Sequence, residues 1–160
     1  MGMDVFGKNP SSEQGKYFRN NVWWWRPLAD YCVEIAPEIC SACKYWQSND
    51  GAGLDAAGAR ALADTLQREV NANRTDAYAR RQASEKEMMP NVACRICAGT
   101  GIRLPVPAVG AGDPKSGGIE CNGCHGSGHV RPWDAEYPFS TENVIEFIAF
   151  LRDCGGFEIC

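Results

Sequence analysis

One cysteine pattern occurs twice in this sequence. The first copy is Cys94-Arg-Ile-Cys97-Ala-Gly-Thr-Gly and the second is Cys121-Asn-Gly-Cys124-His-Gly-Ser-Gly, so both read C-x-x-C-x-G-x-G. Two thiolates three residues apart on a tight turn can point at one ion, and two such knuckles complete a tetrahedral set of four sulfurs. The sequence therefore predicts one closed zinc site on these four cysteines, with iron as the alternative ion.

The glycines and histidines around the knuckles also bear on the metal site. After the second cysteine of each knuckle the backbone must curl around the sulfur, which requires positive φ angles and closely approaching N–H groups. His125 directly follows Cys124, and both side chains reaching one ion would be strained. We therefore expect His125 and His129 to lie at the surface or to support the ligands from outside.

The doubled pattern resembles the zinc-finger region of the DnaJ chaperones. That family carries four such motifs and two zinc ions, whereas this chain has two motifs, which implies one zinc. The resemblance covers residues 94–128 and carries zinc ligation over to the four cysteines. The sequence contains no His-Pro-Asp tripeptide, so the resemblance implies neither a J domain nor its activity.

Five further cysteines lie outside the knuckles. Cys40 and Cys43 form another C-x-x-C, and they could make a second zinc site with two of Cys32, Cys154 and Cys160 if the chain ends meet. The alternative, which we favour, is that all five are small buried apolar residues. A thioredoxin-like redox role is less favoured still, because the βαβ context that it needs is missing.

The sequence offers several candidate contacts for a partner. Three consecutive tryptophans between Asn21 and Arg26 predict either an aromatic hot spot or stacking platform, or, more simply, one core tryptophan with the others packed nearby. The insert at residues 98–120 is either a loop presented by the zinc anchor or a tolerated insertion. The partner-binding candidates, including an acidic C-terminal helix, are Trp23, Trp24, Trp25, Arg103, Glu142 and Glu146.

Catalytic signatures are missing from the sequence. It contains no G-x-S-x-G, Walker loop, H-E-x-x-H or dinucleotide glycine pattern, and the deaminase signature is incomplete. The two histidines both lie in the cysteine-rich segment, which leaves little for ordinary acid–base catalysis. We therefore expect a protein that is not an enzyme.

The elements that position these residues predict an α+β fold. Hydrophobic periodicity and capping residues favour helices at 27–46 (in two parts, from Pro27 and Pro37), 54–72 and 140–154, with Asp50 or Asp55 and Ser140 or Thr141 as caps. Short strands are expected near both ends, the last beside the first. Residues 73–88 are either a solvent-exposed helical extension or a linker. We expect a helical body at 1–93, a zinc-ribbon-like module at 94–132, and a segment at 133–160 that packs back on the body.

Composition and charge limit the function classes. The chain has 160 residues, 16 basic against 20 acidic residues and a net charge of −4, which disfavours binding duplex nucleic acid by bulk charge. Residues 133–160 carry one basic and six acidic residues, a net charge of −5. No apolar run approaches the roughly 18–20 residues that span a bilayer, and no signal peptide is evident, so we expect a reducing cytoplasm and no membrane association.

These observations favour a zinc-stabilised protein-binding module that acts as an inhibitor or an adaptor of a larger complex, such as one that processes nucleic acid. A phage anti-CRISPR that blocks a host nuclease fits this size and charge, and the tryptophan run with the C-terminal Gly-Gly-Phe resembles small bacterial and phage proteins. The first alternative is a single-stranded RNA or DNA binder that uses Arg95, Arg103, Lys115 and Arg131 with the tryptophans. The second is a DnaJ-like holdase for unfolded chains. The sequence leaves the oligomeric state open.

Overall fold

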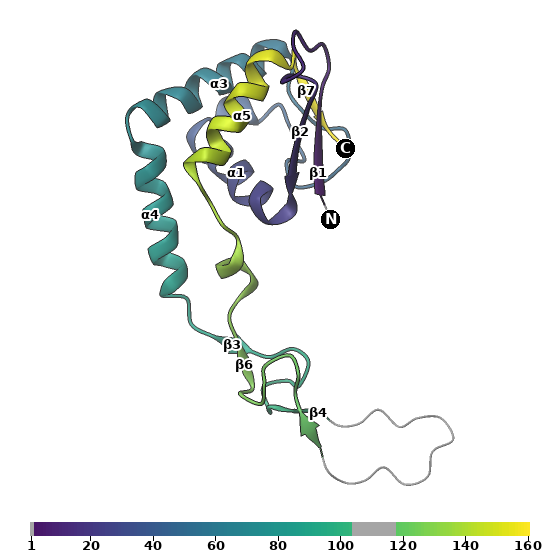
Figure 1. Cartoon of the computed structure of the whole chain (residues 1–160), viewed down its shortest axis with the longest axis vertical. Coiled ribbons are helices and arrows are strands. Elements are labelled where there is room, and N and C mark those ends of the chain that lie inside the picture. The colour runs from purple at the N-terminus through teal and green to yellow at the C-terminus, as the bar shows by residue number, and fades with distance from the viewer. Residues whose placement is uncertain (1, 104–117) are drawn as a thin grey trace, which may run out of the picture. The chain divides into compact units, whose positions relative to one another are not determined.

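The structure, a computed structural model, describes residues 2–103 and 118–160 of the chain (Figure 1). Over these residues helices and short strands are mixed, which confirms the expected α+β class. In chain order the elements are β1 (Gly2–Gly7), β2 (Tyr17–Asn21), α1 (Val22–Ile35), α2 (Pro37–Cys40), α3 (Ala56–Asn71), α4 (Arg74–Glu87), β3 (Val92–Ala93), β4 (Ile102–Arg103), β5 (Ile119–Glu120), β6 (His129–Val130), the 3-10 helix η1 (Trp133–Glu136), α5 (Thr141–Asp153) and β7 (Phe157–Ile159).

The described residues divide into two units. The first, which we call the body, comprises the chain up to Ser84 together with Tyr137–Cys160, and the second, the knuckle unit, is Glu85–Glu136. The body contains the three-stranded sheet and its covering helices. The knuckle unit contains two antiparallel pairs of two-residue strands, β3 with β6 and β4 with β5. Residues 104–117, the centre of the expected insert, lie outside the described residues.

A three-stranded antiparallel sheet joins the two ends of the chain in the body. The strand order is β2-β1-β7, so the expected pairing of the last strand with the first is confirmed. Val5 of β1 lies opposite Phe18 of β2 and Ile159 of β7, and all three are buried. On the opposite face of the sheet, the rings of Phe6 and Tyr17 lie with their centroids 5.0 Å apart, tilted by 33°, and stay exposed. Strand β2 was not predicted.

Helix α1 begins five residues before the predicted start at Pro27. Asn21 caps it, because its side-chain oxygen accepts hydrogen bonds from the backbone N–H groups of Trp23 at 3.0 Å and Trp24 at 3.1 Å. Pro27 therefore lies inside the helix, where it has no N–H to donate to the carbonyl of Trp23. The tryptophan run thus belongs to the first turn of a helix, so its three side chains project in different directions about the helix axis.

The predicted second half of the 27–46 helix is wrong beyond Cys40. Pro37 disfavours helical geometry at the preceding residue, and Ala36 accordingly leaves the helix with φ −138° and ψ 52°. Helix α2 then lasts four residues. The indole Nε1 of Trp46 donates to the carbonyl of Cys40 at 3.1 Å, so the chain satisfies this carbonyl by turning back on itself.

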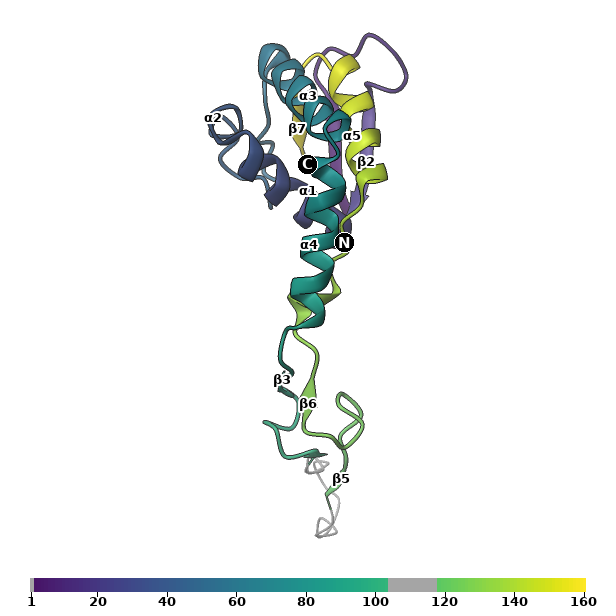
Figure 2. The ribbon, with the colours of Figure 1, turned by 90° about the vertical axis from the view of Figure 1, so that its left-hand side faces the viewer.

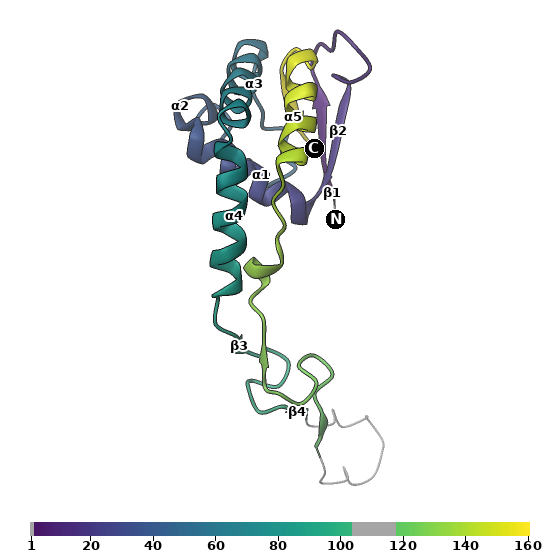
Figure 3. The ribbon, with the colours of Figure 1, turned by 60° about the vertical axis from the view of Figure 1, so that its left-hand side comes forward.

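Helices α3 and α5 lie side by side in the body (Figures 2 and 3). Their caps follow the sequence: Asp55 accepts from the N–H of Gly58 at 2.7 Å, and Ser140 accepts from the N–H of Asn143 at 3.2 Å. Helix α5 presents the expected apolar stripe to the core, whereas α3 buries Ala59 and Ala63 beside the expected Leu62 and Leu66. The buried residues of these two helices are Ala59, Leu62, Ala63, Leu66, Val144, Phe147, Ile148, Phe150 and Leu151.

Phe147 of α5 lies at the centre of the aromatic core. Its ring centroid is 5.1 Å from that of Phe18, 5.7 Å from Trp25 and 6.1 Å from Phe157. Aromatic pairs at these distances stabilise a core beyond simple area burial. The core therefore ties α5 to the sheet and to the first turn of α1.

Residues 74–87 form helix α4, which settles the choice between an extended helix and a linker. Two of its side chains are buried, Thr75 and Tyr78. The Thr75 hydroxyl lies 3.0 Å from the Tyr31 hydroxyl, and the Tyr78 ring centroid lies 4.6 Å from that of Tyr31. The start of this polar helix is therefore anchored to α1, which the weak apolar pattern of the segment did not reveal.

Candidate metal centre

The four cysteines of the repeated pattern meet in the knuckle unit. All four are buried, with exposed fractions between 0% and 7%, and Val130 packs against them. Their sulfur atoms lie within 4.8 Å of one another. Among the described residues, this is the one group of three or more histidine, cysteine or acidic side chains arranged to hold a metal ion.

The sulfur positions fit a zinc ion. The Sγ atoms of Cys94 and Cys121 are 3.9 Å apart, and those of Cys97 and Cys124 are 3.7 Å apart. A zinc–sulfur bond of about 2.3 Å in a tetrahedron places its ligand atoms about 3.8 Å from one another. Two of the six sulfur–sulfur distances thus already match the edge length of such a tetrahedron, and the other pairs lie within 4.8 Å.

Both knuckles curl around their second cysteine in the same way. The N–H of Gly101 points at the Cys97 sulfur and the N–H of Gly128 points at the Cys124 sulfur, each at 3.2 Å. The residue after the second cysteine has positive φ in both copies, 51° at Ala98 and 47° at His125. The repeated sequence therefore builds two copies of one local structure, as the spacing predicts.

The two knuckles also exchange backbone hydrogen bonds. The N–H of Cys94 donates to the carbonyl of Gly128 at 2.8 Å, and the N–H of Cys121 donates to the carbonyl of Gly101 at 2.9 Å. The chains approach so closely that a Cβ on Gly101 would lie 2.2 Å from the carbonyl oxygen of Gly126. With φ 77° as well, this position requires glycine for two independent reasons.

The local environment changes how the thiols ionise. At Cys97 burial opposes ionisation, but hydrogen bonds from the Gly101 N–H and from neighbouring thiols outweigh it and lower the pKa to about 6. At Cys124 burial, together with the thiols around it, raises the pKa to about 11, although the Gly128 N–H lowers it. Close thiols share protons, so the first ionisation makes the next one harder. The group thus supplies one thiolate readily, and its other thiols lose their protons to solvent when a metal cation binds.

Four thiolates close the coordination sphere of a tetrahedral ion, so this site leaves no position for water or substrate. His125 and His129 are exposed, and neither belongs to the four-ligand group. Both histidines thus lie at the surface, which is one of the two positions expected for them. The arrangement of the four cysteines can hold a metal ion such as zinc.

The other five cysteines do not gather into a second metal group in the described part of the chain. Cys32, Cys40, Cys43 and Cys154 are buried in the apolar core, and Cys160 is exposed. The Cys40 thiol donates to the carbonyl of Cys32 at 3.3 Å, and burial raises the pKa of Cys40 to about 12. The second zinc site therefore finds no support, and the four buried thiols pack as small apolar groups.

The three tryptophans have different surroundings. Trp25 is fully buried, and its Nε1 donates to the carbonyl of Trp46 at 2.6 Å, so it has no surface to offer a partner. Trp23 and Trp24 are half-buried, and the Trp23 ring lies 5.0 Å from that of Tyr137. The simpler interpretation, one core tryptophan with the others packed nearby, matches this arrangement.

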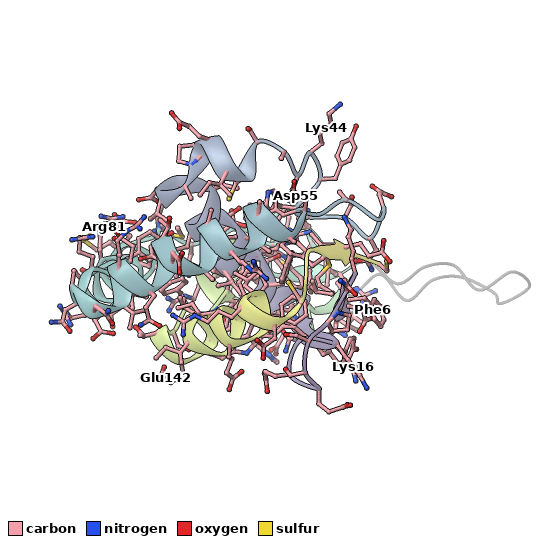
Figure 4. All side chains as sticks on the ribbon, turned by 90° about the horizontal axis from the view of Figure 1, so that it is seen from above. Phe6, Lys16, Lys44, Asp55, Arg81 and Glu142 are labelled. Atoms are coloured by element: carbon pink, nitrogen blue, oxygen red, sulfur yellow. The ribbon has the colours of Figure 1, made fainter. Side chains whose placement is uncertain are left out.

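The charged candidates keep accessible positions. Arg103 is half-buried on β4 and donates to the Asn122 side chain at 2.8 Å. Glu142 and Glu146 are exposed on α5, with exposed Ile145 between them (Figure 4 marks Glu142). These three side chains remain available for contact with a partner.

Sequence analysis missed the exposed isoleucines of the knuckle unit. Ile96 is 56% exposed, Ile102 is 52% exposed and Ile119 is 59% exposed. Ile96 lies between the two cysteines of the first knuckle, and Ile102 and Ile119 lie on paired strands β4 and β5. Their exposure could have been predicted, because the sequence around the cysteines contains no apolar helix or strand that could bury them.

Comparison of the chain with models of protein families, with curated protein sequences and with solved structures found no match. Within the described residues no helix is long and apolar enough to cross a bilayer.

Proposed function

We propose that the chain is a zinc-stabilised protein-binding module of the two-motif DnaJ type. The four cysteines would hold one zinc ion, which fixes the two knuckles and takes no part in chemistry. The donor set, the sulfur spacing and the matching N–H contacts to Cys97 and Cys124 support this assignment. Its contacts with a partner protein would inhibit that partner or link it into a larger complex.

The exposed apolar side chains of the knuckle unit carry this proposal. In the described part of that unit, the buried interior is the four cysteines, with Val130 packed against them. Ile96, Ile102 and Ile119 all remain more than half exposed. Because Ile102 lies opposite Glu120 and Ile119 lies opposite Arg103, these two isoleucines lie on opposite faces of the β4–β5 pair. Apolar side chains are typical of the cores of protein interfaces, so each isoleucine offers a separate contact to a partner protein.

Local packing holds two of these isoleucines in place. A Cβ added to Gly123 would lie 2.5 Å from Cδ1 of Ile96, and one added to Gly118 would lie 2.0 Å from Cγ2 of Ile102. Each isoleucine therefore lies over the bare backbone of a glycine. A preorganised side chain loses less conformational entropy when a partner binds it.

Single-strand nucleic-acid binding is the less supported alternative. A stacking platform needs open aromatic faces beside cationic groups. Trp25 is buried, the Trp23 ring packs near Tyr137, and Arg131 forms an ion pair with Glu136 at 3.5 Å. Among the described residues of the knuckle unit, Trp133 is the one exposed aromatic side chain, whereas the exposed large apolar side chains in the knuckles and on β4 and β5 are isoleucines.

The test is affinity capture from nuclease-treated cell lysate, followed by quantitative mass spectrometry. The bait is the tagged full-length chain, compared with the double variant Ile96→Ser/Ile119→Ser. Ile145→Ser is the matched control, because Ile145 is 48% exposed but lies on α5 of the body. Zinc content is measured for every bait to confirm that the metal centre is intact.

We expect one protein at near-stoichiometric level with the wild-type chain and the Ile145 variant, reduced at least tenfold with the double variant. Equal capture by all three baits would contradict the proposed surface. Bound material that disappears on nuclease treatment would favour the nucleic-acid alternative. Weak capture of many denatured proteins would instead favour a DnaJ-like holdase.

A further inference from the structure

The body has an open hollow of about 800 Å³ on its surface. It lies between α1, α2 and the turn of residues 41–48, and none of its lining belongs to the knuckle unit. On α1 its wall is formed by Asp30, Val33 and Glu34, which share one helix face because they are three and four residues apart. Neither the metal centre nor the proposed knuckle surface uses these residues.

Apolar side chains line much of this hollow. Val33 is 41% exposed and Tyr45 is 59% exposed, whereas Trp46 beside them is buried. The Trp46 carbonyl accepts from Trp25 Nε1 at 2.6 Å and its indole donates to the Cys40 carbonyl at 3.1 Å. The turn that carries Tyr45 is therefore fixed to the core, and the hollow is formed in advance of any binding.

Asp30 adds a carboxylate to this apolar surface. Within the described part of the chain it accepts one hydrogen bond, from Gln47 Nε2 at 2.9 Å, and makes no ion pair. Burial raises its pKa above the usual value, although the Gln47 hydrogen bond and the charge of Arg26 act in the opposite direction. The guanidinium of Arg26 lies 5.6 Å from the centre of the Tyr137 ring; its charge acts on Asp30, but among the described residues it forms no ion pair with that carboxylate.

Elsewhere in the body, an arginine side chain already occupies a place between a carboxylate and an aromatic ring. At the edge of the hollow, Arg81 donates to Glu34 at 3.2 Å while its guanidinium lies 5.0 Å from the centre of the Tyr78 ring. An arginine is thus held between a carboxylate and an aromatic ring. The Lys44 side chain, from another lining residue of the hollow, extends away from the ribbon in Figure 4.

We propose that this hollow binds an arginine side chain from a partner protein. The guanidinium would pair with Asp30 and stack on Tyr45, and its aliphatic stem would cover Val33. Arginine suits this place better than lysine because its planar fork matches a carboxylate, stacks on aromatic rings and is more weakly hydrated. This inference is independent of the proposed function, since it concerns a different unit and a different chemistry.

The test is a titration of the ¹⁵N-labelled full-length chain followed by NMR. The probe is a capped Gly-Arg-Gly peptide, and the comparison probes replace its arginine with citrulline or lysine. Citrulline keeps the shape of arginine and removes its charge. The variants are Asp30→Asn and Tyr45→Leu, and Glu38→Gln is the matched control, because Glu38 is exposed on α2 and does not line the hollow.

We expect shifts of the amide signals confined to residues 30–48 with the arginine peptide, weaker shifts with lysine and none with citrulline. Losing one charge-assisted pair is expected to reduce affinity about tenfold in Asp30→Asn, with a smaller loss in Tyr45→Leu and no change in Glu38→Gln. Equal shifts with the citrulline peptide, or unchanged affinity in Asp30→Asn, would overturn the proposal. Because Asp30→Asn and Glu38→Gln are isosteric surface changes, matching reference spectra will show that both variants remain folded.

Discussion

The body and the knuckle unit stabilise their folds in different ways. Over the described residues, the core of the body contains 26 buried residues from the sheet, the helices and the turns between them, centred on aromatic rings. In the described part of the knuckle unit the buried core is four cysteines, and three isoleucines are exposed. The body can therefore fold by burying apolar surface, whereas we expect the knuckle unit to need a metal ion in place of an apolar core.

The largest expected effect comes from removing a metal ligand. Cys97→Ser should abolish zinc binding and unfold the knuckle unit, because structural zinc sites contribute about 10–16 kcal/mol of apparent binding free energy that also drives folding. The body should keep its thermal transition. Atomic emission and circular dichroism measure both outcomes, with Cys160→Ser as the control because Cys160 is exposed and outside the site. Full zinc content in Cys97→Ser would show that the site is assigned wrongly.

Acidification should release the metal from the wild-type chain. All four sulfurs bind zinc as thiolates, so protons compete with the ion and the affinity must fall as the pH falls. Above its pKa of about 6, Cys97 is ionised before metal arrives, while the pKa of about 11 at Cys124 means that zinc must displace a proton there. Zinc competition with a chromophoric chelator from pH 8 to pH 5 measures this dependence. An affinity that rises toward low pH would be inconsistent with thiolate ligation.

Truncating a core side chain should destabilise the body and leave zinc binding intact, the reverse of removing a metal ligand. Phe147→Ala removes the central ring of the body, and such changes cost about 3–5 kcal/mol of unfolding free energy. The knuckle unit should still hold one zinc ion. Urea unfolding followed by tryptophan fluorescence measures the loss, and Ile145→Ala, at an exposed position of the same helix, should change it little. Loss of zinc in Phe147→Ala would show that the two units do not fold independently.

Two glycines of the first knuckle distinguish the cost of a positive φ angle from the cost of a steric clash. Gly99 and Gly101 both have positive φ, but a Cβ on Gly99 meets no atom closer than 3.5 Å, whereas one on Gly101 would lie 2.2 Å from a carbonyl oxygen. Strained φ angles cost about 1–3 kcal/mol, and the clash at Gly101 adds to this cost. We therefore expect Gly101→Ala to weaken zinc binding clearly more than Gly99→Ala in a chelator competition. Equal weakening would mean that close approach of the knuckles is unimportant.

The smallest effect concerns a helix cap in the body. Ser140→Ala removes the hydrogen bond to the Asn143 N–H at the start of α5, and such caps are worth about 1 kcal/mol. Chemical denaturation should show this decrease without any change in zinc content. Ser84→Ala, on the exposed side of α4, is the control. A decrease of the same size in both variants would indicate that Ser140 does not act as a cap.

The knuckles could be predicted in detail from the sequence because their structure is local. Each C-x-x-C-x-G-x-G segment makes its own N–H contact to sulfur, so spacing and glycines determine the result. Helices α3 and α5 could also be predicted, since strong apolar periodicity coincides with capping residues. The terminal strands were predicted from their apolar residues, and the topology confirms that they pair.

The parts that sequence reasoning missed depend on distant contacts. Strand β2 is one: it contains Asn20, whose burial depends on a hydrogen bond to Asn143, 123 residues away in the chain, and no local pattern reveals that contact. Helix α1 begins before the predicted start at Pro27, because the Asn21 side chain, and not the proline, organises its first turn. The hollow beside Asp30 forms where the chain turns back through Trp46, and only the folded core brings these residues together.

Zinc stoichiometry combined with hydrogen exchange before and after chelation tests the role of the metal most directly. We expect one zinc per chain. We also expect chelation to remove amide protection from residues 92–103 and 118–130 and to leave α3, α5 and the sheet protected. No bound zinc, or knuckle amides that stay protected without it, would contradict the claim that a metal ion takes the place of a core in this unit.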